Sequence, residues 1–299
     1  RAAKGYEETV EELLNPDETT HGMDLDLAER YFIEWNHHVR CVPEYIAFRM
    51  INSKSQLEEK MILFWHGILC HTDSKNQSQI ASHAEWEMLR RCGMGSFKDL
   101  LIEISKDPAM VFYLDNCMSH KAAINENWGR ELLELFSMGV GNYTEDDVKE
   151  CARAFTGWTV TNSIPRYPYG KYEAKFIYDS GDHDFGEKTF LGETGNWNGE
   201  DIINIVAKQP GTARFISRHL YNFFVADEPQ VPAWQDTAPG DPATIKLLQD
   251  EYFPAEQFGE FVVSGVVGVR AHVPLIEGVA LVRFFRPPTV VVHYHRNNF

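Results

Sequence analysis

Apolar side chains recur at helical spacing through most of the chain. A spacing of three or four residues places such side chains on one face of an α-helix. The pattern is strongest in stretches bounded by capping residues, prolines or glycines, at 24–39, 56–71, 78–93, 96–105, 127–138, 198–209, 210–225 and 243–252. Because amphipathic helices must bury their apolar faces against one another, we predict a mainly α-helical fold.

One stretch departs from this pattern. Between 157 and 195, segments rich in β-branched and aromatic residues alternate with Pro and Gly, which is typical of short strands joined by turns. We therefore predict a small β-hairpin insertion around 158–192, within a helical domain that spans 24–253 and follows a polar segment at 1–23. The tail at 254–299 has no Lys and no Asp. It is interpreted either as a β-rich terminal segment or as a non-native or truncated end.

Charge and hydropathy exclude some functions. The chain carries 44 acidic and 28 basic residues, a formal net charge of −16, and this charge would repel nucleic acid and anionic membrane surfaces. We predict no nucleic-acid partner. No apolar run approaches the roughly 18 residues that indicate a transmembrane segment. The five cysteines are scattered without a CxxC pair, which favours free thiols over a disulfide framework.

The helix predicted at 127–138 places a carboxylate on its apolar face. With about 100° per residue from Trp128, Glu131 lies at about 300°, between the apolar residues Met138 and Leu135. A buried carboxylate needs an ion pair, a hydrogen bond, a metal or a proton. Glu134 and Arg130 lie on the flank of the same face.

Two interpretations of Glu131 stay open. In the structural one, Arg130 or Arg153 forms an ion pair with Glu131 and fixes the helix packing. In the catalytic one, Glu131 is a general base or metal ligand, and Arg130 orients it or holds an anionic substrate. The predicted catalytic set is Glu131, Arg130, Glu134, Asn127 and Asp147. Two of its members also have structural explanations, since Asn127, like Asn125, can cap a helix and Asp147 completes a capping box with Thr144.

Histidines supply the predicted metal ligands. His66 lies at the edge of the apolar stripe of the helix at 56–71, and His183 and Asp184 lie in a glycine-bounded loop after a strand. Histidine with carboxylate can bind a divalent metal or relay a proton. The alternatives are a histidine satisfied at the edge of the core and an ordinary Asp-containing turn.

Five stretches together resemble one protein family. They are "EKMILFWHG", "SKDPAMVFYLDN", "NENWGRELLELFSMGVGNYTEDDVKECARAFTGWT", "HDFGEKTFLG" and "QPGTARFISRHLYNFFV". In this order, over about 26–253, they resemble the domain of unknown function 1800 family, which consists of large bacterial proteins that are mostly secreted and mainly helical. The resemblance implies a periplasmic or extracellular location, with a signal segment not present in this chain. It also implies a co-encoded secreted partner resembling sulfatases and phosphatases.

The resemblance nominates positions and shows two departures. The nominated residues are His66, Asn125, Asn127, Arg130, Glu131, Glu134, Tyr143, Asp147, Trp158, His183, Asp184 and Lys188. Many relatives read FWH-x-HF, whereas this chain has Ile68 at the second histidine position. After about Tyr252 the family continues with a helical segment that the tail of this chain does not resemble.

These observations support two hypotheses of function. The first is an extracytoplasmic enzyme that acts on an envelope or extracellular polymer through a carboxylate/histidine site, with a divalent metal as the candidate cofactor. The second is a non-catalytic secreted scaffold or accessory subunit, in which the Glu/Arg network only fixes helix packing.

Overall fold

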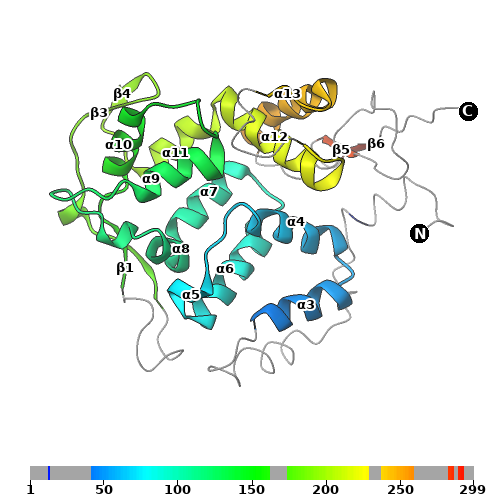
Figure 1. Ribbon diagram of the computed structural model, residues 1–299, viewed down its shortest axis with the longest axis horizontal. Coiled ribbons are helices and arrows are strands. Elements are labelled where there is room, and N and C mark those ends of the chain that lie inside the picture. Colours follow the sequence, from blue (N-terminus) through cyan, green and yellow to red (C-terminus); the bar gives the residue numbers. More distant parts are fainter. Residues whose placement is uncertain are drawn as a thin grey trace, which may run out of the picture.

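The computed structural model describes Leu13 and residues 42–161, 174–228, 237–258, 282–285 and 289–292. Most of these residues are helical, as predicted (Figure 1). The first half contains α3 (Val42–Asn52), α4 (Gln56–His66), α5 (Asp73–Asn76), α6 (Gln79–Cys92), α7 (Phe97–Lys106), α8 (Pro108–Tyr113) and a 3-10 turn (Asn116–Met118). The second half contains α9 (Asn127–Glu131), a π-helix (Leu132–Ser137), α10 (Glu145–Ala154), α11 (Gly199–Ala207), α12 (Pro210–Phe224) and α13 (Pro242–Phe258).

Capping side chains define where these helices begin. The hydroxyls of Ser78 and Ser96 accept hydrogen bonds from the first turns of α6 and α7. Thr144 and Asp147 form the predicted capping box at α10. Each cap satisfies a backbone N–H that has no partner within the helix. The helices predicted from 56 onwards are therefore confirmed, with shifts of a few residues at their ends.

One helix was missed by the sequence analysis. α3 was not predicted, and Pro43 is its second residue, where a proline needs no N–H partner. The segments 1–23 and 24–39 lie outside the described residues, apart from Leu13. The interpretation of the tail also stays a prediction, since only two short strands of it are described.

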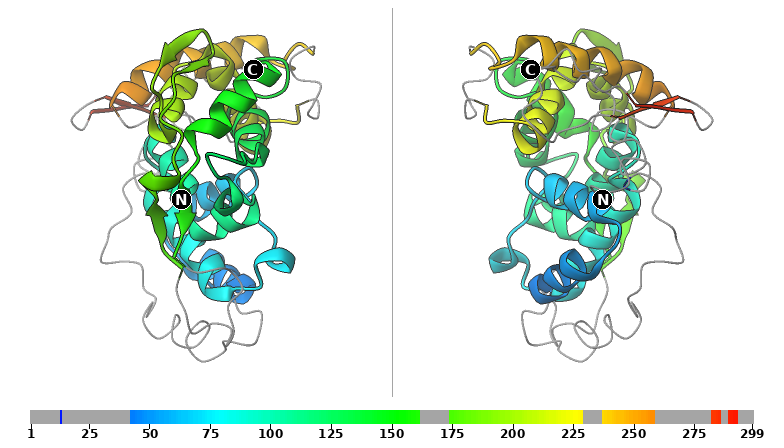
Figure 2. Two further views of the ribbon diagram at one scale, coloured as in Figure 1. Left: turned by 90° about the vertical axis from the view of Figure 1, so that its left-hand side faces the viewer. Right: turned by 90° about the vertical axis from the view of Figure 1, so that its right-hand side faces the viewer.

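Two hairpins form the predicted β insertion. β1 (Trp158–Val160) pairs antiparallel with β2 (Phe176–Tyr178), and β3 (Lys188–Phe190) pairs antiparallel with β4 (Glu193–Gly195). Figures 1 and 2 place them at one edge of the helical body, with α3 at the opposite edge. In the tail, β5 (Val282–Phe285) pairs with β6 (Thr289–Val292).

Aromatic packing joins the helices into one core. The Trp65 ring stacks on Phe97 with ring centroids 5.4 Å apart, and its indole N–H donates to the Gly93 carbonyl at 2.8 Å. On the other side of the core, Phe155 makes edge contacts with Trp128 and Trp158. In the described part of the chain, no helix is both long and apolar enough to cross a membrane.

The π-helix changes which side chains are buried. α9 continues past Glu131 with wider turns, in which the Met138 N–H donates to the Leu133 carbonyl five residues earlier, at 3.0 Å. Leu133 is consequently fully buried, whereas Leu135 is 50% exposed. The prediction that Leu135 lies on the buried face is wrong, because a spacing of 100° per residue does not hold through a π turn.

Gly139 ends the π-helix in a left-handed conformation. Its φ is +77°, and a Cβ atom there would lie 3.0 Å from the Phe215 ring. Gly192 has a similar φ of +84° but open space around it. We predict that Gly192→Ala lowers the free energy of unfolding by about 1 kcal/mol, from backbone strain alone. Gly139→Ala should cost about 2–4 kcal/mol, because overpacking adds to the strain.

Urea denaturation of both variants measures the difference. Equal losses of stability would show that the Phe215 contact does not constrain this turn.

Candidate functional site

Arg130 does not form an ion pair with Glu131. Its guanidinium makes a two-pronged pair with Glu145, at 2.9 and 2.7 Å, and lies 3.6 Å from Glu126. Arg153, the other predicted partner of Glu131, instead binds Asp184 and Glu150. The predicted Arg–Glu131 pair is therefore absent from the described contacts.

Glu131 is only partly buried, and it makes no hydrogen bond or ion pair in the described part of the chain. Burial, with a smaller contribution from the nearby Glu134, raises the pKa of its carboxyl. A partly exposed carboxylate can keep water as its partner. The expectation that Glu131 is the buried carboxylate of this helix is therefore wrong.

Asn125, Asn127 and Asp147 make structural contacts. Glu126 holds the N-cap position of α9, so neither asparagine is the predicted cap. The Asn125 side chain accepts the backbone N–H of Asn127, and the Asn127 amide donates to the Leu114 carbonyl at 3.1 Å. Asp147 completes the cap of α10 and also accepts the Leu191 N–H at 2.7 Å. Asn127 thus connects α9 to the end of α8, and Asp147 connects α10 to the second hairpin. These contacts occupy polar atoms that a catalytic role would need.

His183 and Asp184 fix the β insertion on α10. The buried His183 ring lies 2.8 Å from the Thr156 carbonyl through Nδ1. Asp184 accepts from Arg153 at 2.8 Å, and this guanidinium lowers the pKa of the Asp184 carboxyl. The buried Lys188 ammonium donates to the carbonyls of Asp184 and Gly186.

His66 lies at the last position of α4, away from this loop's contacts. Its ring packs against Trp86, and its Nδ1 lies 3.7 Å from the buried Glu85 carboxylate. Across the described residues, no three His, Cys, Asp or Glu side chains are arranged to hold a metal ion. His66, His183 and Asp184 are therefore not brought together as ligands, and the divalent metal stays a prediction.

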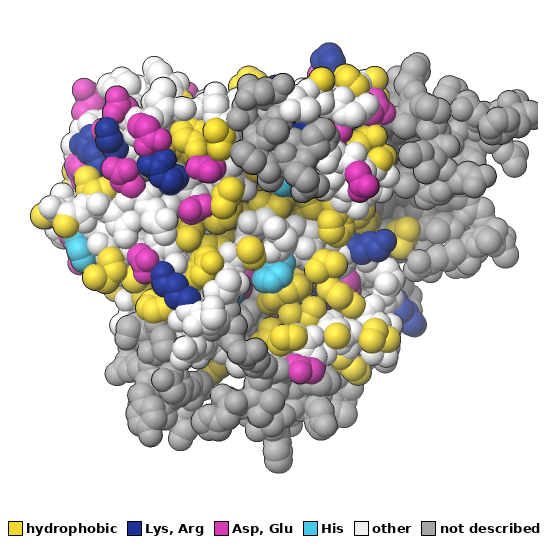
Figure 3. All heavy atoms as spheres, viewed as in Figure 1, with side chains coloured by type: hydrophobic (Ala, Val, Ile, Leu, Met, Phe, Trp, Pro, Cys, Tyr) yellow, Lys and Arg dark blue, Asp and Glu magenta, His cyan; other side chains and the backbone are white. Residues whose placement is uncertain are grey.

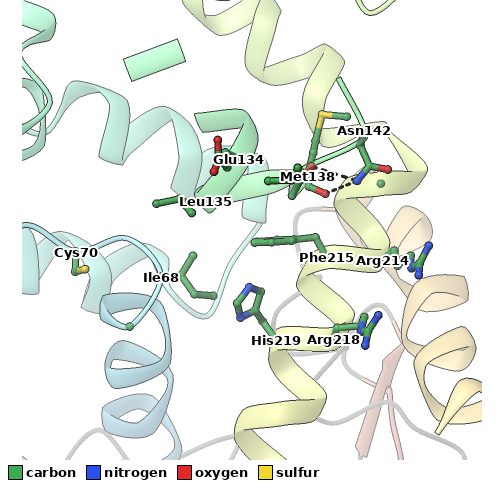
Figure 4. A pocket seen from close by; sticks show the side chains of 14 residues that line it. Ile68, Cys70, Glu134, Leu135, Met138, Asn142, Arg214, Phe215, Arg218 and His219 are labelled. Atoms are coloured by element: carbon green, nitrogen blue, oxygen red, sulfur yellow. Dashed lines mark hydrogen bonds between the residues drawn. The ribbon is translucent and has the colours of Figure 1, made fainter. Parts of the chain in front are cut away.

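A cavity of about 470 Å³ is lined mostly by residues of the stretches that carry the family resemblance (Figure 4). Its walls come from three segments: the loop after α4 (67–70), the π-helix with its following turn (134–142), and α12 (211–219). We call it the signature cavity. Its lining is mainly apolar, and its volume is in the range of small-molecule sites.

Glu134 is the only carboxylate among the described residues that line this cavity. It projects from the π-helix together with Leu135 (Figure 4). The Tyr143 hydroxyl donates to Glu134 Oε2 at 3.1 Å. Burial, followed by the charge of Glu134, raises the pKa of Tyr143, so the phenol keeps its proton and stays a donor. Of the predicted catalytic residues, Glu134 alone lines the signature cavity.

His219 lines the cavity from α12. Its ring packs edge-on against Phe215 with centroids 4.4 Å apart. Burial, with the adjacent Arg218 charge, lowers the pKa of His219 to about 4. The imidazole is therefore neutral at physiological pH, with one nitrogen that donates and one that accepts.

The two arginines of this wall differ in their surroundings. Arg218 is fully buried, and its guanidinium binds Glu228 at 2.9 and 2.6 Å and the Thr237 carbonyl at 2.8 Å. Its charge is therefore balanced by Glu228. Arg214 is half-buried at the cavity wall.

Together these features define a helical protein with a mainly apolar cavity that carries one carboxylate and one neutral imidazole. The family model described as "Protein of unknown function (DUF1800)" matches residues 2–244, so the chain belongs to this family. No curated protein and no solved structure matches it.

The family resemblance and the cavity coincide. Twelve of the fourteen lining residues lie in three of the stretches that carry the resemblance; the exceptions are Ile68 and Cys70. These stretches are far apart in the sequence. His219 was not predicted as a site residue, because "TARFISRHL" carries only the pattern of an amphipathic helix. The i,i+4 spacing of Phe215 and His219 could have indicated a shared face.

The pH dependence of stability tests the burial of His219. The unfolded chain binds a proton near pH 6.5, whereas the folded protein binds it only near pH 4. Stability should therefore fall as the pH falls from 6.5 to 4, with a contribution of about 3 kcal/mol from this histidine.

We predict that His219→Gln weakens this pH dependence. Urea denaturation at pH 7.5, 6.5, 5.5 and 4.5 measures it, and the value at pH 7.5 gives the effect of the substitution itself. An unchanged dependence on pH in the variant would show that His219 is accessible to protons in the folded state.

Proposed function

We propose that this protein is an extracytoplasmic enzyme that acts on an envelope or extracellular polymer, with Glu134 as its general base and His219 as a hydrogen-bond donor to the reacting group. The observation that carries the proposal is the meeting of three family stretches around one cavity. Two side chains able to transfer protons line that cavity, one from the π-helix and one from α12. The location rests on the family resemblance.

The chemistry follows from the two side chains. The Glu134 carboxylate can accept a proton from water or substrate, while Tyr143 holds it in place. The neutral His219 imidazole can donate a hydrogen bond to the atom where negative charge develops. Apolar walls strengthen both interactions, because they lower the local dielectric constant.

The lining also limits the reaction. Most glycoside hydrolases use two carboxylates on either side of the scissile bond, and the described lining supplies only Glu134. This favours proton abstraction, or attack by a water that Glu134 activates. The apolar walls of Met138, Val140 and Phe215 favour a polymer whose reacting group carries an apolar substituent.

Several observations favour the second candidate, a non-catalytic scaffold or accessory subunit. Arg130 with Glu145, Arg153 with Asp184, and Arg218 with Glu228 are ion pairs within the chain. In this alternative the signature cavity holds a group of a partner, for which the co-encoded sulfatase- or phosphatase-like protein is the candidate. A bound divalent metal would be compatible with either function.

Substitutions of two neighbouring carboxylates distinguish the signature cavity from the site predicted by sequence. Glu134→Gln keeps an oxygen that accepts the Tyr143 hydroxyl, so the variant should fold, but it cannot take up a proton. We expect its activity to fall about 100-fold or more. Glu131→Gln, which alters a carboxylate outside the cavity lining, should retain activity within a few-fold.

The measurement is the release of soluble fragments from isolated bacterial envelope polymers, followed by chromatography. Circular dichroism checks that both variants fold. Loss of activity only in Glu131→Gln would support the site predicted from the sequence, in which Glu131 is the general base. Equal activity in all three proteins would remove Glu134 from the mechanism, and release of no fragments by the unmodified protein would favour the scaffold.

A further inference from the structure

A second cavity lies on the other side of the end of α4. Its volume is about 640 Å³, and its walls come from α3, α4, the loop after α4, α5 and α6. We call it the α3 cavity. Figure 3 shows hydrophobic side chains gathered on this face, where Figure 1 places α3, α4 and α6. His66 lines the α3 cavity, whereas Gly67 and Ile68 line the signature cavity.

Three side chains beside the α3 cavity form a hydrogen-bonded relay. His71 Nε2 lies 3.0 Å from the Ser82 hydroxyl oxygen, and His71 Nδ1 lies 2.5 Å from Glu85 Oε2. Ser82 and Glu85 are three residues apart on α6, so they share one face of that helix. His71 and Ser82 line the cavity, and Glu85 lies behind them, fully buried.

The order of contacts is that of an activated nucleophile. A hydroxyl, an imidazole within hydrogen-bond distance of it, and a carboxylate on the other ring nitrogen are the three parts of a catalytic triad. The triad is recognised by this geometry and not by the order of residues in the chain. Here the residues follow in the order His, Ser, Glu.

The buried carboxylate is suited to its position. Burial alone would raise the pKa of Glu85, but its contacts with His66 and His71 outweigh this effect and hold the pKa below its usual value. The carboxylate therefore stays charged and can stabilise an imidazolium on His71. Glu85 Oε1 faces His66 Nδ1 at 3.7 Å, on the side of the carboxylate away from the His71 contact.

Asp107 is a further buried carboxyl group that interacts with Glu85 and His71. Burial, with the charge of Glu85, raises the pKa of Asp107 to about 8. At neutral pH Asp107 is thus largely protonated, which leaves Glu85 as the charged carboxylate beside His71.

We infer that Ser82, His71 and Glu85 form a second catalytic site, which hydrolyses esters of short- or medium-chain carboxylic acids. The acyl chain would occupy the apolar part of the cavity, between Ile46 and Met50 of α3, Leu63 of α4 and Trp86 of α6. The Gln79 amide, on the same wall, is a candidate donor to the oxyanion.

The reaction proceeds in two steps. The Ser82 hydroxyl oxygen attacks the ester carbonyl carbon, and its proton passes to His71 Nε2. The ester C–O bond breaks, the alcohol leaves with that proton, and the acyl group stays on Ser82. Water then attacks the acyl carbon and gives a proton to His71, which returns it to the Ser82 oxygen as the carboxylic acid leaves. No oxidation or reduction occurs.

A serine-directed reagent tests the site in the full chain. A fluorophosphonate probe should modify Ser82, as located by peptide mass spectrometry. Ser74 is the matched control, since it is more exposed than Ser82, lines the same cavity and hydrogen-bonds to Thr72 without contacting a histidine. Modification of Ser74 instead, or of no serine, would overturn the proposal.

Ester hydrolysis gives the second readout. The unmodified protein should hydrolyse p-nitrophenyl butyrate and hexanoate faster than the acetate, because the longer chains fill the apolar wall. Ser82→Ala should lose about 100-fold or more of this activity, whereas Ser74→Ala should stay within twofold. Circular dichroism confirms that both variants fold.

The role of Ser82 as the nucleophile and the role of the apolar wall as the acyl site are tested separately. Equal hydrolysis by Ser82→Ala and the unmodified protein, or no hydrolysis by either, would show that the relay only joins the loop to α6. Hydrolysis that depends on Ser82 but is fastest with acetate would overturn the assignment of the apolar wall as the acyl site. None of these results depends on Glu134 or His219.

Discussion

The packing of the π-helix determines where the polar side chains of this segment lie. Leu132, Leu133, Phe136 and Ser137 are all buried, as two consecutive pairs four residues apart, a spacing that places both pairs on one face of the helix. The π turns change the position of Leu135, which is 50% exposed although a spacing of 100° per residue places it on the apolar face. Glu134 and Leu135 remain outside the core, and both line the signature cavity. Burial of the neighbouring apolar side chains thus places the candidate catalytic carboxylate.

Buried charge is compensated throughout the described part of the chain. Glu59 lies between Arg49 and Arg90, Glu228 binds Arg218, and Glu85 contacts His71. Since an unpaired buried charge costs several kcal/mol, each pair fixes the position of two elements. Arg218 shows the consequence for the cavity, because its pair with Glu228 holds the α12 wall on which His219 stands. The Arg218–Glu228 pair therefore also fixes the position of one wall of the candidate site.

Much of the fold could be predicted from the sequence, because caps and apolar periodicity are local signals. Ser78, Ser96 and Thr144 mark helix starts that the structure confirms. The π turn could not be predicted, since it lies where this segment packs against α11 and α12, and no local signal indicates that packing. The error at Leu135 follows directly from it.

The site was harder to predict than the fold, because its residues meet only through tertiary contacts. Glu134 was identified among several polar neighbours that turned out to hold helices and hairpins together. His219 lies 85 positions further along the chain, and its neutral state arises from burial against Phe215. His71, Ser82 and Glu85 were missed for the same reason, since the loop that carries His71 has no periodic pattern relating it to α6.

Ile68, where this chain departs from many relatives, lines the signature cavity. Many relatives have histidine at this position. In this chain the Ile68 side chain lines the cavity together with Glu134 and His219. In such relatives a second imidazole would enter the same cavity, where a carboxylate and two imidazoles could serve as metal ligands. This chain presents an apolar side chain instead, which leaves one carboxylate and one neutral imidazole. Under the proposed function, this lining suits proton transfer by Glu134 with a hydrogen bond from His219, and it lacks the second imidazole that such a metal site would use.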